Sequence, residues 1–406
     1  MSFQLTYNSS NTIPEIELPS SKSISNRLLI ASALSSNKIE LVNLSDARDT
    51  VELQNALSST SGTVDVGMAG TAYRFLTAYF ALQTEKRILT GASRMKERPI
   101  GILVEELRKL GANVKYLDRE GFPPLEISDG NIKGGKLTMD ASVSSQYISA
   151  LLLVAPYLDS GLEIDLMGEV VSYPYIDLTI ALQNQLNVTA FRKENKVVVL
   201  PGDYSSKKEI VVEADWSSAA FFYQLVAFSE KSLFIKNLNP NSQQGDVACW
   251  KLFQNFGVST NFVNNGALLS YDSTLLKREL QLDLTKTPDL IPSIAVTASQ
   301  LLDKITIIGT KTLYIKESNR VEALRNELLK VGALLNELNG NSLEIISSRL
   351  MLTNAPITFS TYNDHRMAMC LAPLAIYTKV QLDQKMVVEK SFPNFWIELE
   401  KFGISN

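Results

Sequence analysis

Two short segments in the second half of the chain hold residue types that can move protons. Asp289 follows a proline, and Glu317 directly follows Lys316. A carboxylate positioned against a reacting group can deliver or remove a proton, and flanking cations favour its ionised form. Lys316 and Arg320 are four residues apart, which would place them on one helical face around Glu317. Asp289 and Glu317 are therefore acid–base candidates; an ordinary Glu317–Arg320 pair on an exposed helix is the alternative.

Lysines and arginines recur close to the expected starts of helices. Helix N-termini carry free N–H groups and partial positive charge, so they bind anions. Additional cations there would repel the helix end unless an anion is the intended occupant. The pattern predicts a cleft that binds phosphate or carboxylate groups. The cations are Lys22, Arg27, Arg74, Arg98, Lys316, Arg320, Arg366 and Lys390.

Hydroxyl, amide and glycine residues lie at several of the same helix starts. Ser23 beside Lys22 suits a phosphoryl oxygen, and the glycine at position 70 would let the backbone approach a ligand closely. Ser144-Ser-Gln146 and Ser172-Tyr-Pro-Tyr175 suit a polyhydroxylated, phosphorylated ligand. Helix capping explains these hydroxyls equally well.

The segment Asp364-His-Arg366 leads into an apolar helix, which would bury its charged groups. Buried charges are paired or functional, so this segment is a further candidate for function. His365 suits a structural hydrogen bond at least as well as a catalytic role.

Composition excludes several classes of site. Two cysteines, Cys249 and Cys370, and one histidine leave no disulfide framework, no thiolate metal site and no site built from several histidines. A net charge of −4 argues against electrostatic binding of nucleic acid by the chain as a whole. We expect no secretory signal, and the longest apolar stretches are about half of what a bilayer span needs. We expect a cytoplasmic protein.

Two helical patterns alternate along the chain. One is amphipathic and ends at a glycine suited to a left-handed C-cap, with aliphatic or β-branched residues beyond it that indicate a strand. Its four copies span residues 105–111, 251–257, 326–332 and 397–403. Weaker versions without the glycine lie around Val51–Leu57 and Leu178–Asn187.

The other pattern is a more apolar segment, typical of a buried helix, about 30 residues before each amphipathic one. Together they indicate six copies of one unit: buried helix, strand, amphipathic helix, strands. We expect an α/β (α+β) fold of two domains, three units each, with the ligand cleft between them. The buried segments are Ser20–Leu34, Gly70–Leu82, Ser144–Leu158, Asp215–Phe228, Pro288–Leu301 and Asp364–Tyr377.

The sequence motifs described above, in the order in which they occur along the chain, closely resemble those of the 5-enolpyruvylshikimate-3-phosphate synthase family. Its members are the enolpyruvyl transferases of the shikimate pathway. The resemblance runs from Lys22 to Phe395, nearly the whole chain. It is carried by Lys22-Ser-Ile-Ser-Asn-Arg27, Ala69-Gly-Thr-Ala, Arg94-Met-Lys-Glu-Arg-Pro-Ile100, Ser142-Val-Ser-Ser-Gln146, Tyr175-Ile-Asp, Pro288-Asp289, Lys316-Glu317, Tyr362-Asn-Asp-His-Arg-Met-Ala-Met-Cys370 and Lys390-Ser-Phe-Pro.

The family resemblance implies two domains of three βαβαββ-like repeats with buried parallel helices. Residues 1–20 and 214–406 would form one discontinuous domain, and residues 21–213 the other. The reaction would transfer the enolpyruvyl group of phosphoenolpyruvate to the 5-hydroxyl of shikimate 3-phosphate by addition and elimination through a tetrahedral intermediate. It implies no metal, no organic cofactor, no nucleic-acid or membrane partner, and a monomer.

The resemblance also implies a role for individual residues. Proton transfer would fall to Asp289 and Glu317, with Lys22 as a third catalytic residue. Shikimate 3-phosphate would be bound by Lys22, Ser23, Arg27, Ser144, Ser145, Gln146, Ser172, Tyr175, Asp289 and Lys316. Phosphoenolpyruvate would be bound by Lys22, Gly70, Arg98, Gln146, Arg320, Arg366 and Lys390.

Four residues depart from the commonest family pattern, and none removes a charged ligand or proton donor. In the Gly70 loop, Met68 stands where Asn is usual and Phe75 where Pro is usual. Thr312 replaces an Asn that contacts the shikimate phosphate, and Asn319 replaces an Asp. Two alternatives remain: the related transferase that acts on UDP-N-acetylglucosamine, and a non-catalytic phosphosugar- or RNA-end-binding protein.

Overall fold

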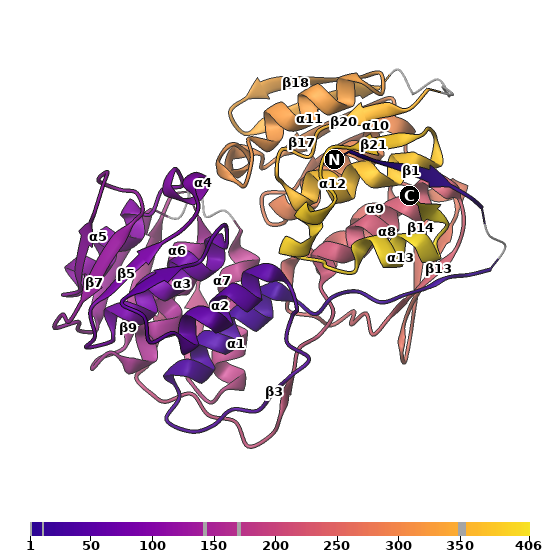
Figure 1. Cartoon of the computed structure of the whole chain (residues 1–406). Helices are drawn as coiled ribbons and strands as arrows, with labels where there is room; N and C mark the ends of the chain where they lie inside the picture. Colours follow the sequence, from indigo (N-terminus) through magenta and orange to yellow (C-terminus); the bar gives the residue numbers. More distant parts are fainter. Residues whose placement is uncertain (1, 10–11, 141–143, 169–171, 348–354) are drawn as a thin grey trace. The chain divides into compact units, whose positions relative to one another are not determined.

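A computed structural model of the chain describes residues 2–9, 12–140, 144–168, 172–347 and 355–406. The chain divides into two compact units. One is formed by Met1–Pro19 together with Glu213–Asn406, and the other by Ser20–Val212 (Figure 1). Each unit repeats one arrangement of strands and helices, and each is described by itself.

Two complete βαβαββ repeats form most of the 20–212 unit. In each, the first two strands are parallel, and the last two form an antiparallel hairpin beside the second strand. The sheet orders are β4-β5-β7-β6 and β8-β9-β11-β10. The first repeat comprises β4 (Thr63–Asp65), α3 (Gly70–Ala81), β5 (Arg87–Thr90), α5 (Gly101–Lys109), β6 (Asn113–Tyr116) and β7 (Leu125–Ser128). The second comprises β8 (Gly135–Asp140), α6 (Ser145–Val154), β9 (Leu162–Met167), α7 (Tyr173–Gln185), β10 (Ala190–Lys193) and β11 (Lys196–Val199).

The third repeat of this unit is reduced. β12, at the end of the unit, pairs in parallel with β3 in a sheet of two strands. After α2 the chain runs on to β4, so the described residues of this repeat hold no terminal hairpin. The sequence of α2 lacks the closing glycine, but so does that of α7, whose repeat is complete. The elements are α1 (Lys22–Leu34), β3 (Leu41–Val42), α2 (Arg48–Ser58) and β12 (Ile210–Val211).

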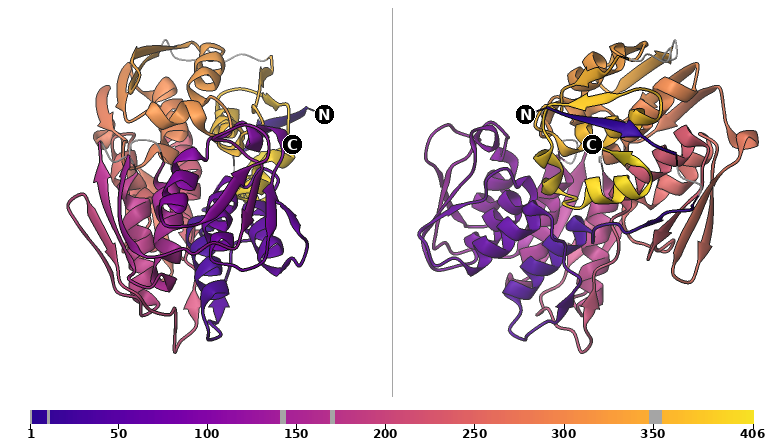
Figure 2. Two further views of the ribbon diagram at one scale, coloured as in Figure 1. Left: turned by 90° about the vertical axis from the view of Figure 1, so that its left-hand side faces the viewer. Right: turned by 45° about the vertical axis from the view of Figure 1, so that its right-hand side comes forward.

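The other unit contains three complete repeats. In two of them, one strand comes from the N-terminal segment of the chain. β2 pairs in parallel with β13, and β1 pairs antiparallel with β21 and β22. Figure 2 shows this indigo N-terminal strand beside the yellow C-terminal strands. The first repeat comprises β2 (Glu15–Ile16), α8 (Trp216–Ser229), β13 (Leu233–Lys236), α9 (Cys249–Gln254), β14 (Val258–Val263) and β15 (Gly266–Tyr271). The second comprises β16 (Glu279–Asp283), α10 (Ile291–Leu301), β17 (Lys304–Ile308), α11 (Arg320–Leu329), β18 (Ala333–Asn339) and β19 (Ser342–Ser347). The third comprises β20 (Ile357–Phe359), α12 (His365–Leu371), β21 (Val380–Leu382), α13 (Phe395–Lys401), β22 (Ile404–Ser405) and β1 (Phe3–Tyr7).

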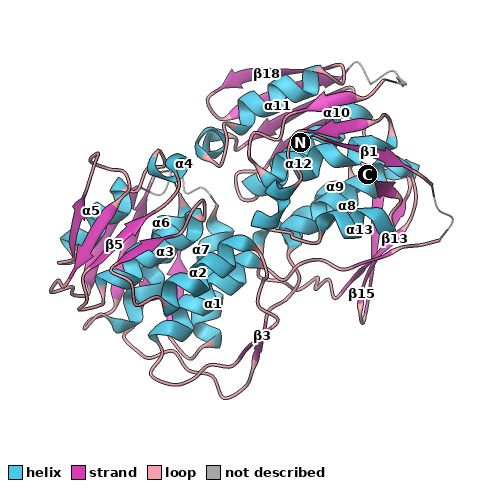
Figure 3. Ribbon diagram, in the orientation of Figure 1, coloured by secondary structure: helices cyan, strands magenta, loops and turns pink. Residues whose placement is uncertain are grey.

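The expected buried helices form the core of each unit, which confirms that prediction. α8, α10 and α12 contact one another in one unit (Figure 3), and α1, α3 and α6 do so in the other. Two of these helices end earlier than expected, because Pro156 and Pro373 follow and leave a 3₁₀ turn in place of the last helical turn. Within the described residues, no helix is both long and apolar enough to cross a membrane.

The expected glycine caps are present at the ends of the four amphipathic helices. Gly111, Gly257, Gly332 and Gly403 have φ of 101°, 84°, 78° and 102°. These left-handed values are accessible to glycine without a steric penalty, so each helix stops there and a strand follows. The sequence phrase therefore identified both where these helices end and where the next strand begins.

Candidate active site

Arg320 is the centre of a buried charged cluster in the unit that contains both chain ends. It is the first residue of α11, and its side chain is 1% exposed. Nε donates to Asp364 Oδ2 at 2.8 Å, and Nη2 donates to Glu317 Oε2 at 3.0 Å. Burial alone would lower the pKa of Arg320, but the charges of Asp364 and Glu317 outweigh it and raise that pKa. The arginine is therefore a fixed, permanently charged group.

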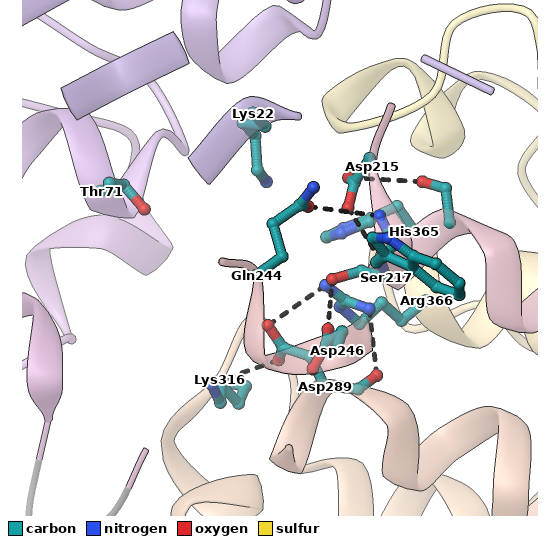
Figure 4. A network of polar contacts seen from close by, with 12 residues as sticks. Lys22, Thr71, Asp215, Ser217, Gln244, Asp246, Asp289, Lys316, His365 and Arg366 are labelled. Carbon is teal, nitrogen blue, oxygen red and sulfur yellow. Dashed lines mark hydrogen bonds and ion pairs between the residues drawn. The ribbon is translucent and has the colours of Figure 1, made fainter. Parts of the chain in front are cut away.

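Asp289 lies in a short 3₁₀ helix, Pro288–Leu290, and is surrounded by three cations. Lys316 Nζ lies 3.4 Å and Arg320 Nη1 3.5 Å from its Oδ1. Arg366 Nη2 lies 3.1 Å from its Oδ2, and Arg366 Nη1 donates to its backbone oxygen at 3.0 Å (Figure 4). A carboxylate held in this way is oriented by cations that also attract anionic ligands.

Glu317 bridges two cations from different parts of the fold. Its Oε2 pairs with Arg320, while its Oε1 accepts from Lys390 Nζ at 3.0 Å. Lys390 ends a 3₁₀ helix, Met386–Lys390, and both side chains of this pair are nearly buried. The cluster thus presents two carboxylates, Asp289 and Glu317, within a network of lysines and arginines.

The expected helical face shared by Lys316 and Arg320 is wrong. Asn319 is the N-cap of α11, with its side chain accepting from Glu322 N at 3.3 Å, so the helix begins only at Arg320. Lys316 and Glu317 lie before the helix. The alternative of an exposed helical ion pair also fails, because Arg320 is almost inaccessible to solvent.

The charged start of α12 is buried, as the sequence predicted. Asp364 is fully buried, caps the helix by accepting from Arg366 N at 2.9 Å, and binds Arg320. His365 is 2% exposed. The sequence named this segment as a candidate for function but gave Asp364 no individual role, because its N-cap pattern gives no sign of a partner 44 residues away.

Asp246 is a second site residue that the sequence did not reveal. It lies in a 3₁₀ helix, Gly245–Ala248, is 4% exposed, and accepts a hydrogen bond from Ser217 Oγ. Burial raises its pKa to about 7, with the charge of Asp289 acting in the same direction and that of Arg366 opposing it (Figure 4). Asp246 can therefore change its charge near neutral pH beside Asp289.

In the 20–212 unit, Lys22 begins α1 and pairs with a carboxylate from α2. Its Nζ lies 3.1 Å from Asp49 Oδ2, and the Asp49 side chain is 6% exposed. Ser21, the N-cap of α1, precedes it. Asp49 is a third residue that the sequence did not identify, because nothing in its local pattern distinguishes it from an ordinary acidic residue in a first helical turn.

Arg27, one turn further along α1, is buried among neutral partners. Its Nε donates to Thr179 Oγ1 at 2.8 Å, and Nη2 donates to Ser149 Oγ at 3.0 Å and to the backbone oxygen of Tyr175 at 3.2 Å. Nη1 donates to the Ser23 backbone oxygen at 2.8 Å. Burial lowers the pKa of Arg27 to about 10. None of these bonds neutralises the guanidinium, so this region favours an anion.

Arg98 lies against the N-terminus of α3. It is 7% exposed, and its Nε and Nη1 have no hydrogen-bond partner among the described residues. A Cβ placed on Gly70, the first residue of α3, would lie only 2.4 Å from Arg98 Nη1. A buried, unsatisfied guanidinium beside the free N–H groups of a helix start is the arrangement expected for an anion site.

Polar residues begin two further helices of this unit, α6 and α7. Ser144 caps α6, accepting from Gln146 N at 3.3 Å, and Gln146 Nε2 donates to Thr71 Oγ1 at 3.2 Å. Ser145 is buried. Ser172 precedes α7 with φ of 60° and makes no capping hydrogen bond with its side chain. A non-glycine residue in this left-handed conformation carries a steric cost, which makes Ser172 a candidate for function.

The residues expected from sequence thus fall into two clusters, one in each unit. Among the described residues, no group of three or more His, Cys, Asp and Glu is arranged to hold a metal ion. Of the resemblance motifs, only the first two residues of Ser142–Gln146 lie outside the described part. One cluster contains Lys22, Ser23, Arg27, Gly70, Arg98, Ser144, Ser145, Gln146, Ser172 and Tyr175, and the other Asp289, Lys316, Glu317, Arg320, Arg366 and Lys390.

Comparison with known proteins gives one consistent answer. The model of the family EPSP synthase (3-phosphoshikimate 1-carboxyvinyltransferase) matches residues 54–399. A 3-phosphoshikimate 1-carboxyvinyltransferase of Bacteroides fragilis (strain YCH46) is 41% identical over 391 residues, covering 96% of this chain and 95% of the relative. One from Sulfurovum sp. (strain NBC37-1) is 34% identical over 418 residues, covering 96% of each.

A solved structure shares the fold. The EPSP synthase from Acinetobacter baumannii superposes with a TM-score of 0.77 over 99% of this chain and 98% of that one, at 18% sequence identity.

Proposed function

The chain belongs to the EPSP synthase (3-phosphoshikimate 1-carboxyvinyltransferase) family, and we propose that its two polar clusters carry out the family's reaction. The enzyme transfers the enolpyruvyl group of phosphoenolpyruvate to the 5-hydroxyl of shikimate 3-phosphate and releases phosphate, a step of aromatic biosynthesis. The family match across residues 54–399 is the observation that carries this conclusion.

Shikimate 3-phosphate is bound, in this proposal, by polar residues of both units. The uncompensated charge of Arg27 and the hydroxyls at the starts of α6 and α7 support binding of its phosphate. In the same proposal Asp289 accepts a hydroxyl proton; its orientation by cations at both carboxylate oxygens supports this role. The residues are Lys22, Ser23, Arg27, Ser144, Ser145, Gln146, Ser172, Tyr175, Asp289 and Lys316.

In the same proposal, phosphoenolpyruvate is bound by lysines and arginines of the two clusters, several of which are already oriented by ion pairs. The unsatisfied donors of Arg98 over Gly70 support an anion at the start of α3. Arg320, Arg366 and Lys390 already form ion pairs with Asp289 and Glu317. A bound phosphoenolpyruvate would therefore interact with cations that these two carboxylates also contact. The full set is Lys22, Gly70, Arg98, Gln146, Arg320, Arg366 and Lys390.

The chemistry requires one proton to reach the methylene carbon and another to leave the 5-hydroxyl. We assign the carbon proton to Glu317 and the hydroxyl proton to Asp289, with Lys22 as a further catalytic residue. Addition gives a tetrahedral intermediate, and elimination of phosphate returns the carbon proton. The surrounding lysines and arginines neutralise the charge of two anionic substrates, which would otherwise repel each other.

A phosphate-release assay with both substrates tests the proposal. Phosphate should appear only when shikimate 3-phosphate and phosphoenolpyruvate are both present. UDP-N-acetylglucosamine serves as the control acceptor and should give none. Both cysteines are fully buried, and burial raises the pKa of each thiol, so neither offers the reactive thiol typical of the enzyme that uses that acceptor. Phosphate release with the control acceptor alone would overturn the proposal.

We also propose that the enzyme acts as a cytoplasmic monomer, without metal, organic cofactor, nucleic acid or membrane partner. The near balance of 39 basic and 43 acidic residues supports the absence of a nucleic-acid partner. Light scattering during size exclusion should give a mass near 44.9 kDa, and twice that mass would contradict the monomer. Activity should survive dialysis against a chelator.

A further inference from the structure

The turn that leads into α12 has an unfavourable backbone conformation. Thr361 O accepts from Asp364 N at 2.8 Å, and between them Tyr362 and Asn363 have φ of 55° and 54°. Two consecutive left-handed residues are the pattern of a type I′ turn, in which Asn is tolerated but a bulky aromatic residue is disfavoured. Such a conformation persists only where the surrounding structure holds it.

Two carboxylates hold this turn by hydrogen bonds. Glu327, on α11 and 1% exposed, accepts from the Tyr362 hydroxyl at 2.8 Å and from Ser360 N at 3.2 Å. Asp383, directly after β21, accepts from Ser360 Oγ at 2.7 Å and from Thr361 N at 2.9 Å. Burial would raise the pKa of Asp383, but these hydrogen bonds outweigh it and keep that pKa below its usual value.

The turn ends in the residue that organises the charged cluster. Asp364 binds Arg320 through both carboxylate oxygens and starts the helix that carries Arg366. Arg320 and Glu327 are seven residues apart on α11, which is close to two helical turns and places them on one face. α11 therefore contacts the turn twice: Arg320 binds its last residue, and Glu327 binds the tyrosine within it.

We infer that Glu327, acting through the Tyr362 hydroxyl, is a positioning residue for Arg320 and Arg366. The inference rests on the proposed function, which assigns both arginines to phosphoenolpyruvate. Among the contacts of the described residues, Glu327 makes none with the proposed substrate-binding groups themselves. It fixes the turn whose last carboxylate orients Arg320 and whose helix carries Arg366 to Asp289.

The chain offers a matched control for this glutamate. Glu398 on α13 is also buried and also pairs with a lysine three residues later, Lys401, as Glu327 pairs with Lys330. Glu398 likewise accepts from a backbone N–H, that of Glu17, at 2.9 Å. It has no described contact with the turn or the arginines, so its loss reports the general cost of removing a buried glutamate.

The test compares Glu327→Gln and Tyr362→Phe with Glu398→Gln and wild type. Hydrogen exchange of the peptide covering residues 360–366 reports whether the turn is held, independently of catalysis. Steady-state kinetics give kcat and the KM for each substrate. We expect faster exchange in both turn variants, and a rise of roughly tenfold in KM for phosphoenolpyruvate from misplaced arginines. KM for shikimate 3-phosphate should change less than twofold, and Glu398→Gln should match wild type in exchange and kinetics.

Each other outcome overturns the inference in a distinct way. Unchanged exchange would mean that Glu327 does not hold the turn. Faster exchange with unchanged KM for phosphoenolpyruvate would make the contact purely structural, and an equal rise in KM in Glu398→Gln would make the effect general. If wild type consumes neither substrate, the proposed function fails, and this inference fails with it; an active wild type with unaltered turn variants refutes the inference alone.

Discussion

Arg320 and Asp364 form a two-bond ion pair, with Nε 2.8 Å from Oδ2 and Nη2 3.2 Å from Oδ1. The side chains are 1% and 0% exposed, so neither charge is solvated when its partner is lost. Breaking a buried pair costs about 3–5 kcal/mol when the remaining charge has no other partner. Arg320 keeps Glu317 and Asp289 as anionic neighbours, so the lower end of that range applies. We therefore expect Asp364→Asn to lower the free energy of unfolding by about 3 kcal/mol, measured by urea denaturation.

The control for that variant is Glu337→Gln. Glu337 pairs with Arg325 at 3.1 Å, but both side chains are about two-fifths exposed. Exposed pairs contribute about 0–1 kcal/mol, so this change should be nearly neutral. Equal losses in the two variants would show that burial does not decide the strength of the Arg320–Asp364 pair.

Glu317 is expected to carry the proton to and from the methylene carbon. Glu317→Gln keeps the size and most hydrogen bonds of the side chain but removes the transferable proton. A positioned acid–base group contributes about 10²–10⁴ in rate, so kcat should fall by that factor, measured by phosphate release. Binding of shikimate 3-phosphate, measured by calorimetry, should change much less.

Glu322→Gln is the matched control, because Glu322 lies exposed in the first turn of α11 and should leave kcat unaltered. If Glu317→Gln keeps most of its kcat, Glu317 only pairs with Arg320 and Lys390. Carbon protonation would then have to be reassigned, with Lys22 or Asp289 next in line.

The sequence predicted the helices well because the physical signals for them are local. Continuous apolar runs predicted the buried helices, and glycines such as Gly257 marked where amphipathic helices end. The missing hairpin of the reduced repeat is not marked by any residue in it. The weak phrase around Val51–Leu57 does not distinguish this copy either, because the equally weak phrase around Leu178–Asn187 belongs to a repeat with a complete hairpin.

The candidate site was predictable in its residue types but not in its pairings. Helix capping by Asn319 decided that Glu317 lies outside α11, although the spacing alone favoured a shared face. Asp49 and Asp246 entered the clusters through tertiary contacts with Lys22 and Ser217, which lie 27 and 29 residues away in the chain. Contacts at such separations depend on the packing of whole repeats, which no local pattern encodes.

Gly70 is expected to set the space available to the Arg98 guanidinium. In Gly70→Ala the new Cβ would lie 2.4 Å from Arg98 Nη1, so the guanidinium must move. A displacement of about 1 Å in a binding group can cost up to about 10² in rate, so KM for phosphoenolpyruvate should rise at least about tenfold. The thermal midpoint should hardly change, because alanine is a better helix former than glycine.

Gly62→Ala provides the comparison, since no atom lies within 4 Å of the position that its new Cβ would take. That variant should bind both substrates as wild type does. A Gly70→Ala enzyme with unchanged KM for phosphoenolpyruvate would show that Arg98 does not contact this substrate.

Asp246 should make the stability of the protein depend on pH. Burial raises its pKa to about 7, so between pH 3.8 and 7 the folded state holds a proton that the unfolded chain has released. The contribution of Asp246 to the stability of the folded state is fully present below its unfolded-state pKa of 3.8. It is lost as the pH rises through its folded-state pKa of about 7. Asp246→Asn cannot ionise, so relative to wild type it should gain about 2 kcal/mol between pH 5 and pH 8.

Urea denaturation at the two pH values measures this difference. Asp272→Asn is the control, because hydrogen bonds from Thr274 keep the pKa of Asp272 below its usual value. That carboxyl is ionised in both states throughout this range, and its removal should alter stability equally at pH 5 and pH 8. A pH-independent effect of Asp246→Asn would mean that Asp246 is already ionised at pH 5.

Ser172 is expected to lower the stability of the folded protein through its backbone conformation while its hydroxyl contributes to substrate binding. Its φ of 60° is unfavourable for a residue with a side chain, and the side chain makes no capping bond in return. Ser172→Gly should therefore raise the free energy of unfolding by up to about 1 kcal/mol. Loss of the hydroxyl should weaken shikimate 3-phosphate binding about tenfold, as expected for one hydrogen bond to a charged group.

Glu194→Gly separates the two effects. Glu194 has φ of 53° in the exposed turn between β10 and β11, and it has no proposed role in binding. It should gain similar stability in urea denaturation while the calorimetric Kd for shikimate 3-phosphate stays at the wild-type value. If Ser172→Gly gains stability and keeps that Kd as well, the left-handed conformation of Ser172 serves the start of α7 alone, and Ser172 must be removed from the residues that bind shikimate 3-phosphate.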